Sequence, residues 1–145
     1  MNIFIRSFFS IIIGFIFGSA VNMLFIELGN YLFPIPGVNP QNLVDLKISF
    51  PNLDFKYFIF PFLAHSIGTL SGAFITTQIA KKHQLLLSII IGVLFLFGGI
   101  YMAFLLSGPV WFIISDLLLA YIPMAWLGYK IALMIVKIKS NKKAT

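Results

Sequence analysis

Residues 60–74 read FPFLAHSIGTLSGAF, and this stretch decides the fold. It is apolar enough to lie in a bilayer, yet it carries His65, followed by a ladder of small residues. About 20 consecutive apolar residues cross the hydrocarbon core of a bilayer. The apolar sequence around this stretch covers residues 57–80, so we interpret it as a membrane-spanning segment.

Three further segments have this character, and they cover residues 7–28, 84–106 and 109–136. The 145-residue chain is 60% hydrophobic and only 10% charged, which leaves too few polar residues to cover a water-facing globule. Backbone groups in lipid must find their hydrogen bonds within each segment, which favours helices. We therefore predict an all-α integral membrane protein, an antiparallel four-helix bundle that forms a single domain over residues 1–145.

The first segment could also be a signal peptide, since residues 18–20 resemble a small-residue cleavage site. Apolar sequence continues to Ile26, however, and this favours an uncleaved anchor.

The basic residues predict the orientation of the four spans. Arg6 precedes the first span, Lys81 and Lys82 lie between the second and third, and a basic tail over residues 137–145 follows the fourth. With an even number of spans, all three places fall on one side of the membrane. The positive-inside rule then puts both termini in the cytoplasm.

Charge and composition also limit the partners. The net charge of +6 comes from residues at span ends, and no basic stripe with interleaved aromatic residues exists for nucleic acid. The chain has no cysteine, which excludes disulfides and thiolate metal sites. We expect the lipid bilayer as the main partner, with a second copy or another membrane protein as an additional one, and we expect no cofactor.

The longest loop, residues 29–56, lies on the outer side in this topology. Pro34, Pro36 and Gly37 prevent a helix at its start. Asn39 as N-cap and Pro40 at the first helical position then predict a short helix that ends near Ile48. In the fourth span, Pro123 removes one helical hydrogen bond and predicts a kink.

Small residues recur every four positions on the first two spans, a spacing that lets helix backbones approach closely. We favour a tight helix interface over a substrate groove for them. The residues predicted to pack helices are Gly14, Gly18, Gly68, Gly72 and Gly128.

The ionisable or strongly polar residues within the spans include Asn22, Glu27, His65, Tyr101, Asp116 and Tyr121. Such groups are expensive in lipid unless they are paired or hydrated. At about 1.5 Å per residue, four of them, one on each span, fall in one layer roughly 8 to 12 Å below the outer surface. These four are Asn22, His65, Tyr101 and Asp116.

We predict that Asp116 pairs with His65 in this layer, that Asn22 and Tyr101 complete the hydrogen bonds, and that Glu27 lines the entrance. The cluster either fixes the register of the helices or forms a site for a ligand, a proton or an ion. No metal site is expected, because Glu27 lies about one turn too shallow to complete a ligand set. No catalytic motif accompanies the serines, so we predict no catalytic residues.

Four stretches together carry a resemblance to a family: GSAVNM at 18–23, residues 60–74, IGVLFLFGGI at 91–100 and LAYIPMAWLG at 119–128. Over nearly its whole length the chain resembles a group of small four-span bacterial inner-membrane proteins with no assigned activity. The resemblance implies the fold and an inner-membrane location, but no role for any residue.

The sequence therefore predicts a multi-pass membrane protein that is not an enzyme and acts by helix packing and interaction. The alternative is a small oligomeric transporter or proton- or ion-conducting protein that uses His65 and Asp116.

Overall fold

The computed structural model describes residues 3–144 of the chain, and the side chains of residues 3–138. All regular structure in this range is helical. The helices are α1 (Ile3–Leu32), α2 (Leu43–Ser49), α3 (Ile59–Ile79), α4 (Gln84–Leu106), α5 (Val110–Leu119) and α6 (Ile122–Ala144), with short 3₁₀ helices η1 (Phe50–Asn52) and η2 (Phe55–Phe58).

Four helical segments in the described range are long and apolar enough to cross a membrane, which confirms this part of the prediction. They are Ile3–Leu32, Phe55–Ile79, Gln84–Leu106 and Val110–Ile138. Many of their large apolar side chains are exposed, including Phe4 at 77% and Phe104 at 82%. Of the predicted basic tail, the side chains after Ile138 lie outside the described residues.

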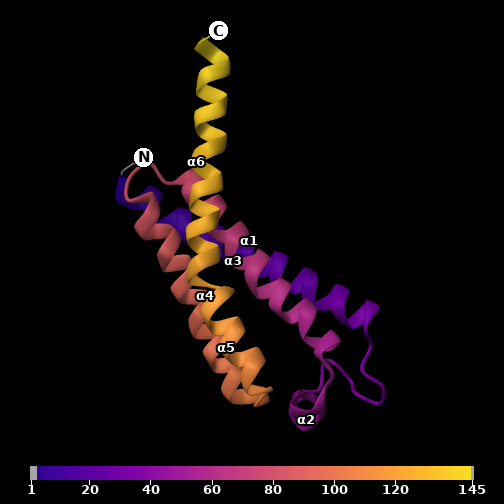
Figure 1. The fold of residues 1–145 in the computed structure, drawn as a ribbon. Coiled ribbons are helices and arrows are strands. Elements are labelled where there is room, and N and C mark those ends of the chain that lie inside the picture. The colour runs from indigo at the N-terminus through magenta and orange to yellow at the C-terminus, as the bar shows by residue number, and fades with distance from the viewer. Residues whose placement is uncertain (1–2, 145) are drawn as a thin grey trace.

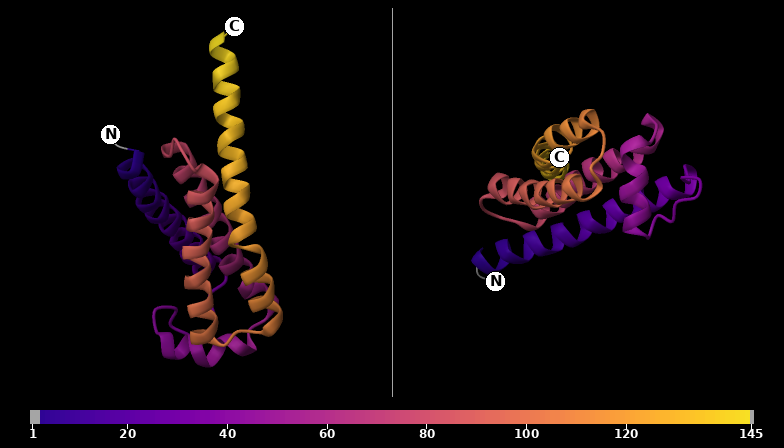
Figure 2. Two further views of the ribbon diagram at one scale, coloured as in Figure 1. Left: turned by 90° about the vertical axis from the view of Figure 1, so that its left-hand side faces the viewer. Right: turned by 90° about the horizontal axis from the view of Figure 1, so that it is seen from below.

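Helix α3 lies at the centre of the molecule, where it contacts α1, α4 and α6. Figure 1 shows α1 and α3 side by side, with α4 and the α5–α6 segment forming the other half of the bundle. The start of α1, the connection between α3 and α4, and the end of α6 lie at one end of the molecule, whereas α2 and the connection between α4 and α5 lie at the other. The last turns of α6 project beyond the other helices (Figure 2).

Glycines bring α1 into backbone contact with α3. A Cβ added at Gly18 would lie 2.6 Å from the carbonyl oxygen of Gly68, and one added at Gly14 would lie 2.6 Å from that of Gly72. Thr76 Oγ1 donates a hydrogen bond to the Ser10 carbonyl oxygen at 3.1 Å, beside the same contact. Side chains at these glycines would separate the two helices.

Helix α6 approaches α3 in the same way, at Gly128. An added Cβ there would collide with the backbone carbonyl of Leu70 and lie 3.1 Å from the backbone nitrogen of Phe74. Because these obstacles are backbone atoms, they cannot move aside as a flexible side chain can.

The predicted start of the short loop helix is wrong. Helix α2 begins at Leu43, with Asn42 as its N-cap, and the Asn42 side chain accepts a hydrogen bond from the Val44 backbone N–H at 3.0 Å. Asn39 instead accepts a hydrogen bond from the Gln41 N–H at 3.0 Å. Asparagine stabilises both Asx turns and helix N-caps in this way, which explains why the sequence alone misassigned the cap.

The fourth span is not one continuous helix. Helix α5 ends at Leu119, α6 begins at Ile122, and Ala120 and Tyr121 form a turn between them. Pro123 has no N–H to donate to the Leu119 carbonyl, so the regular ladder cannot pass through this point. The predicted kink at Pro123 is thus present as a break just before the proline.

Candidate functional site

His65 and Asp116 form a close polar pair between α3 and α5. The His65 Nδ1 atom lies 2.9 Å from each of the two carboxylate oxygens of Asp116. The Asp116 side chain is 5% exposed, whereas that of His65 is 19% exposed. The carboxylate is therefore almost completely removed from solvent, and its hydrogen bonds must come from the protein.

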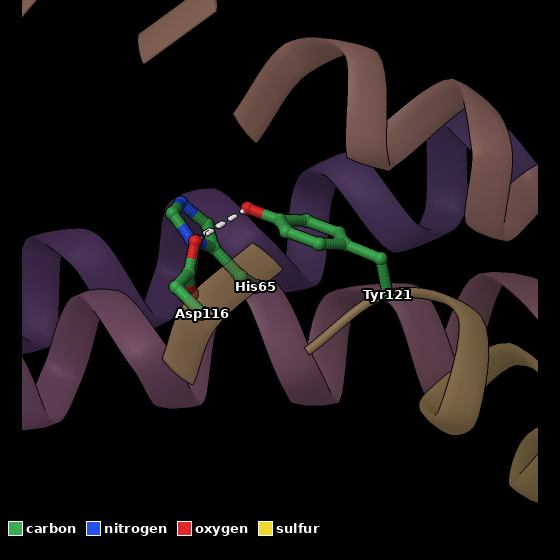
Figure 3. Close-up of polar contacts among 3 residues, drawn as sticks. All are labelled: His65, Asp116 and Tyr121. Atoms are coloured by element: carbon green, nitrogen blue, oxygen red, sulfur yellow. Dashed lines mark hydrogen bonds and ion pairs between the residues drawn. The ribbon is translucent and has the colours of Figure 1, made fainter. Parts of the chain in front are cut away.

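Tyr121 is the third member of this cluster, which we call the triad. Its hydroxyl donates to Asp116 Oδ2 at 2.8 Å and lies 2.9 Å from His65 Nδ1. Figure 3 shows the phenol and the carboxylate converging on the imidazole ring. Tyr121 is 1% exposed and occupies the break between α5 and α6, so the triad holds this break against α3.

Gly99 on α4 makes room for the Tyr121 ring. A Cβ added at Gly99 would collide with the Tyr121 hydroxyl and lie 2.5 Å from the ring carbon that bears it. A residue with a side chain at this position would displace the hydroxyl from Asp116. The triad therefore depends on all four segments that meet here: α3, α4, α5 and the turn between α5 and α6.

A cavity of about 160 Å³ adjoins the triad. The ends of α1 and α4, the start of α3, helix α5 and the segment between α1 and α3 supply its walls. Most of the lining is apolar and includes Phe33, Phe50, Phe60 and Phe112. The polar side chains that line it are Asn30, Lys56, Tyr57, His65 and Asp116. An apolar cavity with a few convergent polar groups is the usual form of a small-molecule site.

The other residues predicted for the polar layer do not join the triad. Tyr101 is 66% exposed on the outer face of α4. Asn22 lies against Gly68 at the contact between α1 and α3, and within the described residues no hydrogen bond links it to the triad. Glu27 is exposed on α1 and does not line the cavity.

The exclusion of Tyr101 has a geometric cause. The rise per residue along a helix predicts the depth of Tyr101 in the membrane. It does not predict the side to which the residue points, which depends on a rotation of about 100° per residue. Gly99 faces Tyr121, so Tyr101, two residues later, points about 200° away from it.

Sequence reasoning placed Tyr121 in a span but missed its role. Tyr121 follows Asp116 by five residues, which puts its Cα about 7.5 Å deeper along a regular helix. A regular helix would also turn Tyr121 about 140° away from Asp116. Tyr121 instead lies in the break between α5 and α6, where a phenol is long enough to reach back by about one turn. The combination of a tyrosine with a proline two residues later was the available signal.

Within residues 3–138, no three His, Cys, Asp or Glu side chains gather closely enough to hold a metal ion. Comparison with known proteins gives no further assignment, because no family model, curated protein or solved structure matches the chain. The triad and the cavity are therefore the features of this chain that bear on its function.

Proposed function

We propose that this chain is a multi-pass membrane protein that binds a small, largely apolar ligand in the cavity beside the triad. The observation that carries this proposal is the cavity of about 160 Å³, whose walls are mostly apolar and which has His65 and Asp116 among its few polar groups. Cavities of about 150 Å³ with apolar walls hold molecules the size of benzene. The cavity thus has room for a small ring or for one end of a longer molecule.

The proposed setting is a bacterial inner membrane with both termini in the cytoplasm. Arg6 lies near the start of α1, and Lys81 and Lys82 lie in the connection between α3 and α4. Figure 1 shows these two parts of the chain and the end of α6 at one end of the molecule. Positive charge favours the cytoplasmic side. In this orientation the cavity and α2 face outward, so the ligand enters from the outer side of the membrane or from its outer leaflet.

We propose a binding function and not an enzymatic one. The His65 Nδ1 edge is occupied by Asp116 and Tyr121. A nucleophile activated by a histidine must lie within hydrogen-bond reach of it, and within the described residues no serine or threonine hydroxyl is hydrogen-bonded to His65. The binding partner is a small molecule, in addition to the bilayer itself.

The binding proposal is tested with the full chain in lipid nanodiscs and with toluene as an apolar probe. Ala103 lines the cavity, so Ala103→Phe is expected to fill it and to abolish saturable toluene binding in ligand-observed NMR. Ala20→Phe is the matched control, because Ala20 is exposed on α1 and a phenylalanine there leaves the cavity open. Equal toluene binding by Ala103→Phe and wild type would contradict a site in this cavity.

Orientation is tested separately. The chain lacks cysteine, so Lys47→Cys and Lys82→Cys each introduce a single thiol. A membrane-impermeant maleimide added to intact cells is expected to label Cys at position 47 only. Labelling at position 82 without cell lysis would refute the proposed orientation.

Transport is the second candidate function, and one observation favours it. The span formed by α5 and α6 is broken at Tyr121, beside the ionisable pair His65 and Asp116. Interrupted spans with polar groups at the break form the substrate sites of many transporters. Four spans are few for such a function, so this candidate requires a dimer or a larger assembly.

Proteoliposome flux of protons and small ions tests this candidate. Wild type is compared with His65→Ala and Asp116→Asn, with folding monitored in parallel. Flux in wild type that both variants lose supports transport. Equal values for all three, none above empty liposomes, exclude conduction of the ions tested.

A further inference from the structure

We propose that the ligand of this cavity presents an oxygen hydrogen-bond acceptor to His65 Nε2. The chemical class is an apolar carbonyl compound about the size of one six-membered ring, or a longer molecule that ends in such a ring. This inference rests on the proposed binding function and identifies the ligand class for the same site.

The His65 ring has one edge, at Nε2, without a hydrogen-bond partner among the described residues. Nδ1 is engaged by Asp116 and Tyr121, so Nε2 is the remaining polar atom of the ring. No hydrogen bond to Nε2 is formed within the described residues. Two side-chain polar atoms in that range are fully buried without a partner, Ser66 Oγ and Thr69 Oγ1. Nε2 is not one of them, so it is not sealed from solvent. Because His65 lines the cavity, we infer that Nε2 faces it.

Whether Nε2 carries a proton depends on how the protons are arranged between His65 and Asp116. If Asp116 is ionised and the ring is an imidazolium, both ring nitrogens carry a proton. If Asp116 is neutral and donates its proton to Nδ1, the neutral ring carries its own proton on Nε2. The triad has zero net charge in both arrangements, and in both of them Nε2 is a donor.

With Tyr121 donating to Asp116 Oδ2, a protonated Asp116 has only Nδ1 to receive its proton. Nε2 then becomes an acceptor only when an ionised Asp116 faces a neutral ring with its proton on Nδ1. The triad then has a net charge of −1. Asp116 is 5% exposed in a mostly apolar setting, and within the described residues no lysine or arginine forms an ion pair with it, so a net charge on the triad is expensive to bury. The two arrangements with zero net charge are therefore favoured, and the cavity offers a hydrogen-bond donor at its polar end.

The charges that line the cavity do not suit a cationic ligand. The charged side chains that line the cavity are Lys56 and Asp116, with His65 as a titratable neighbour. Asp116 already interacts with two protein groups, whereas the lysine repels cations. A ligand amine would find no uncommitted acceptor of opposite charge, while a carbonyl oxygen matches the donor on Nε2.

Histidine-selective ¹⁵N NMR tests the protonation of Nε2 directly. The chain has two histidines, and His83→Gln assigns the His65 signals. At neutral pH, in nanodiscs without ligand, we expect the His65 Nε2 signal to be that of a protonated nitrogen. A signal typical of an unprotonated Nε2 would overturn the inference and leave the cavity proposal intact.

A probe series tests the ligand class. Toluene, acetophenone and benzylamine have one ring each and differ in offering no acceptor, a carbonyl acceptor and a cation. Binding to Ala103→Phe measures partition into lipid and is subtracted. One additional hydrogen bond predicts that acetophenone binds about three- to tenfold more tightly than toluene, and that benzylamine binds more weakly than acetophenone.

The double variant His65→Phe/Asp116→Leu removes the donor without leaving an unpaired carboxylate or adding an amide donor to the cavity, and it should bind acetophenone and toluene equally. Equal affinities in wild type, or a preference for benzylamine, would overturn the inference while the binding function stands. No binding of any probe above Ala103→Phe would overturn the proposed function and the inference together. If the double variant does not fold, the wild-type series and the NMR measurement still decide.

Discussion

Replacing Tyr121 with phenylalanine isolates the contribution of the triad to stability. The substitution removes only the hydroxyl that donates to Asp116 Oδ2 at 2.8 Å. The phenylalanine ring can keep the place beside Gly99 that the tyrosine ring occupies. The change therefore deletes one hydrogen bond and leaves the packing in place.

The expected loss follows from the environment of Asp116. In the arrangement with an ionised Asp116 beside an imidazolium, the Tyr121 hydroxyl donates to a charged group, and such a hydrogen bond contributes about 1.5 to 3 kcal/mol. Asp116 is 5% exposed, so water cannot readily replace the lost donor, and His65 remains its other hydrogen-bond partner. We expect Tyr121→Phe to lower the free energy of unfolding by about 1.5 to 3 kcal/mol.

The measurement is reversible unfolding of the purified chain in mixed micelles with increasing denaturing detergent. Tyr101→Phe is the matched control: Tyr101 is 66% exposed, and a surface change of this kind shifts stability by less than about 0.5 kcal/mol. In an Asp116→Asn background, Tyr121→Phe should cost less than in wild type, because the charged acceptor is gone. Equal losses for the two tyrosines, or an undiminished loss in that background, would refute this account of the triad.

Three further substitutions test the packing and the connections. Gly128→Ala should destabilise by about 1 to 3 kcal/mol, because its Cβ meets the backbone of α3, whereas Gly98→Ala has open space and should not destabilise in the same unfolding assay. Ser107→Gly should stabilise by up to about 1 kcal/mol, since Ser107 has φ +50°, and a loss of stability would contradict this. Thr76→Val should cost about 0.5 to 1.5 kcal/mol, as the hydrogen bond to Ser10 is lost, and an unchanged midpoint would assign that bond no net value.

Hydropathy alone was sufficient to predict the helical class and the four long apolar segments, because a span needs only a length and an absence of charge. The sequence was also sufficient to predict that His65 and Asp116 lie close together, since two antiparallel connections and a fixed rise per residue place them at one depth. The rotation of each helix about its own axis could not be predicted, because it depends on which side chains pack against which neighbours. Tyr101 and Tyr121 exchanged roles for this reason.

The cavity could not be predicted from the sequence either. Its walls combine the ends of α1 and α4 with residues of the segment between α1 and α3, such as Leu46 and Phe50. The shape of a long loop follows from local turn chemistry and from contacts distant in sequence. The N-cap of α2 is an example, because the sequence predicts Asn39 as the cap whereas the structure has Asn42.

The triad also changes the choice between a structural and a binding role for His65. One edge of the ring, at Nδ1, joins α3 to Asp116 on α5 and to Tyr121 at the break. The opposite edge, at Nε2, has no hydrogen-bond partner within the described residues, and His65 lines the cavity. A ligand at Nε2 would therefore contact the same ring that holds the helix break, while α1 is held to α3 separately through Gly14 and Gly18. Ligand binding should accordingly protect the amides around the α5–α6 break from hydrogen exchange more than those at the α1–α3 contact. Equal protection at both places would contradict a contact between the ligand and the triad.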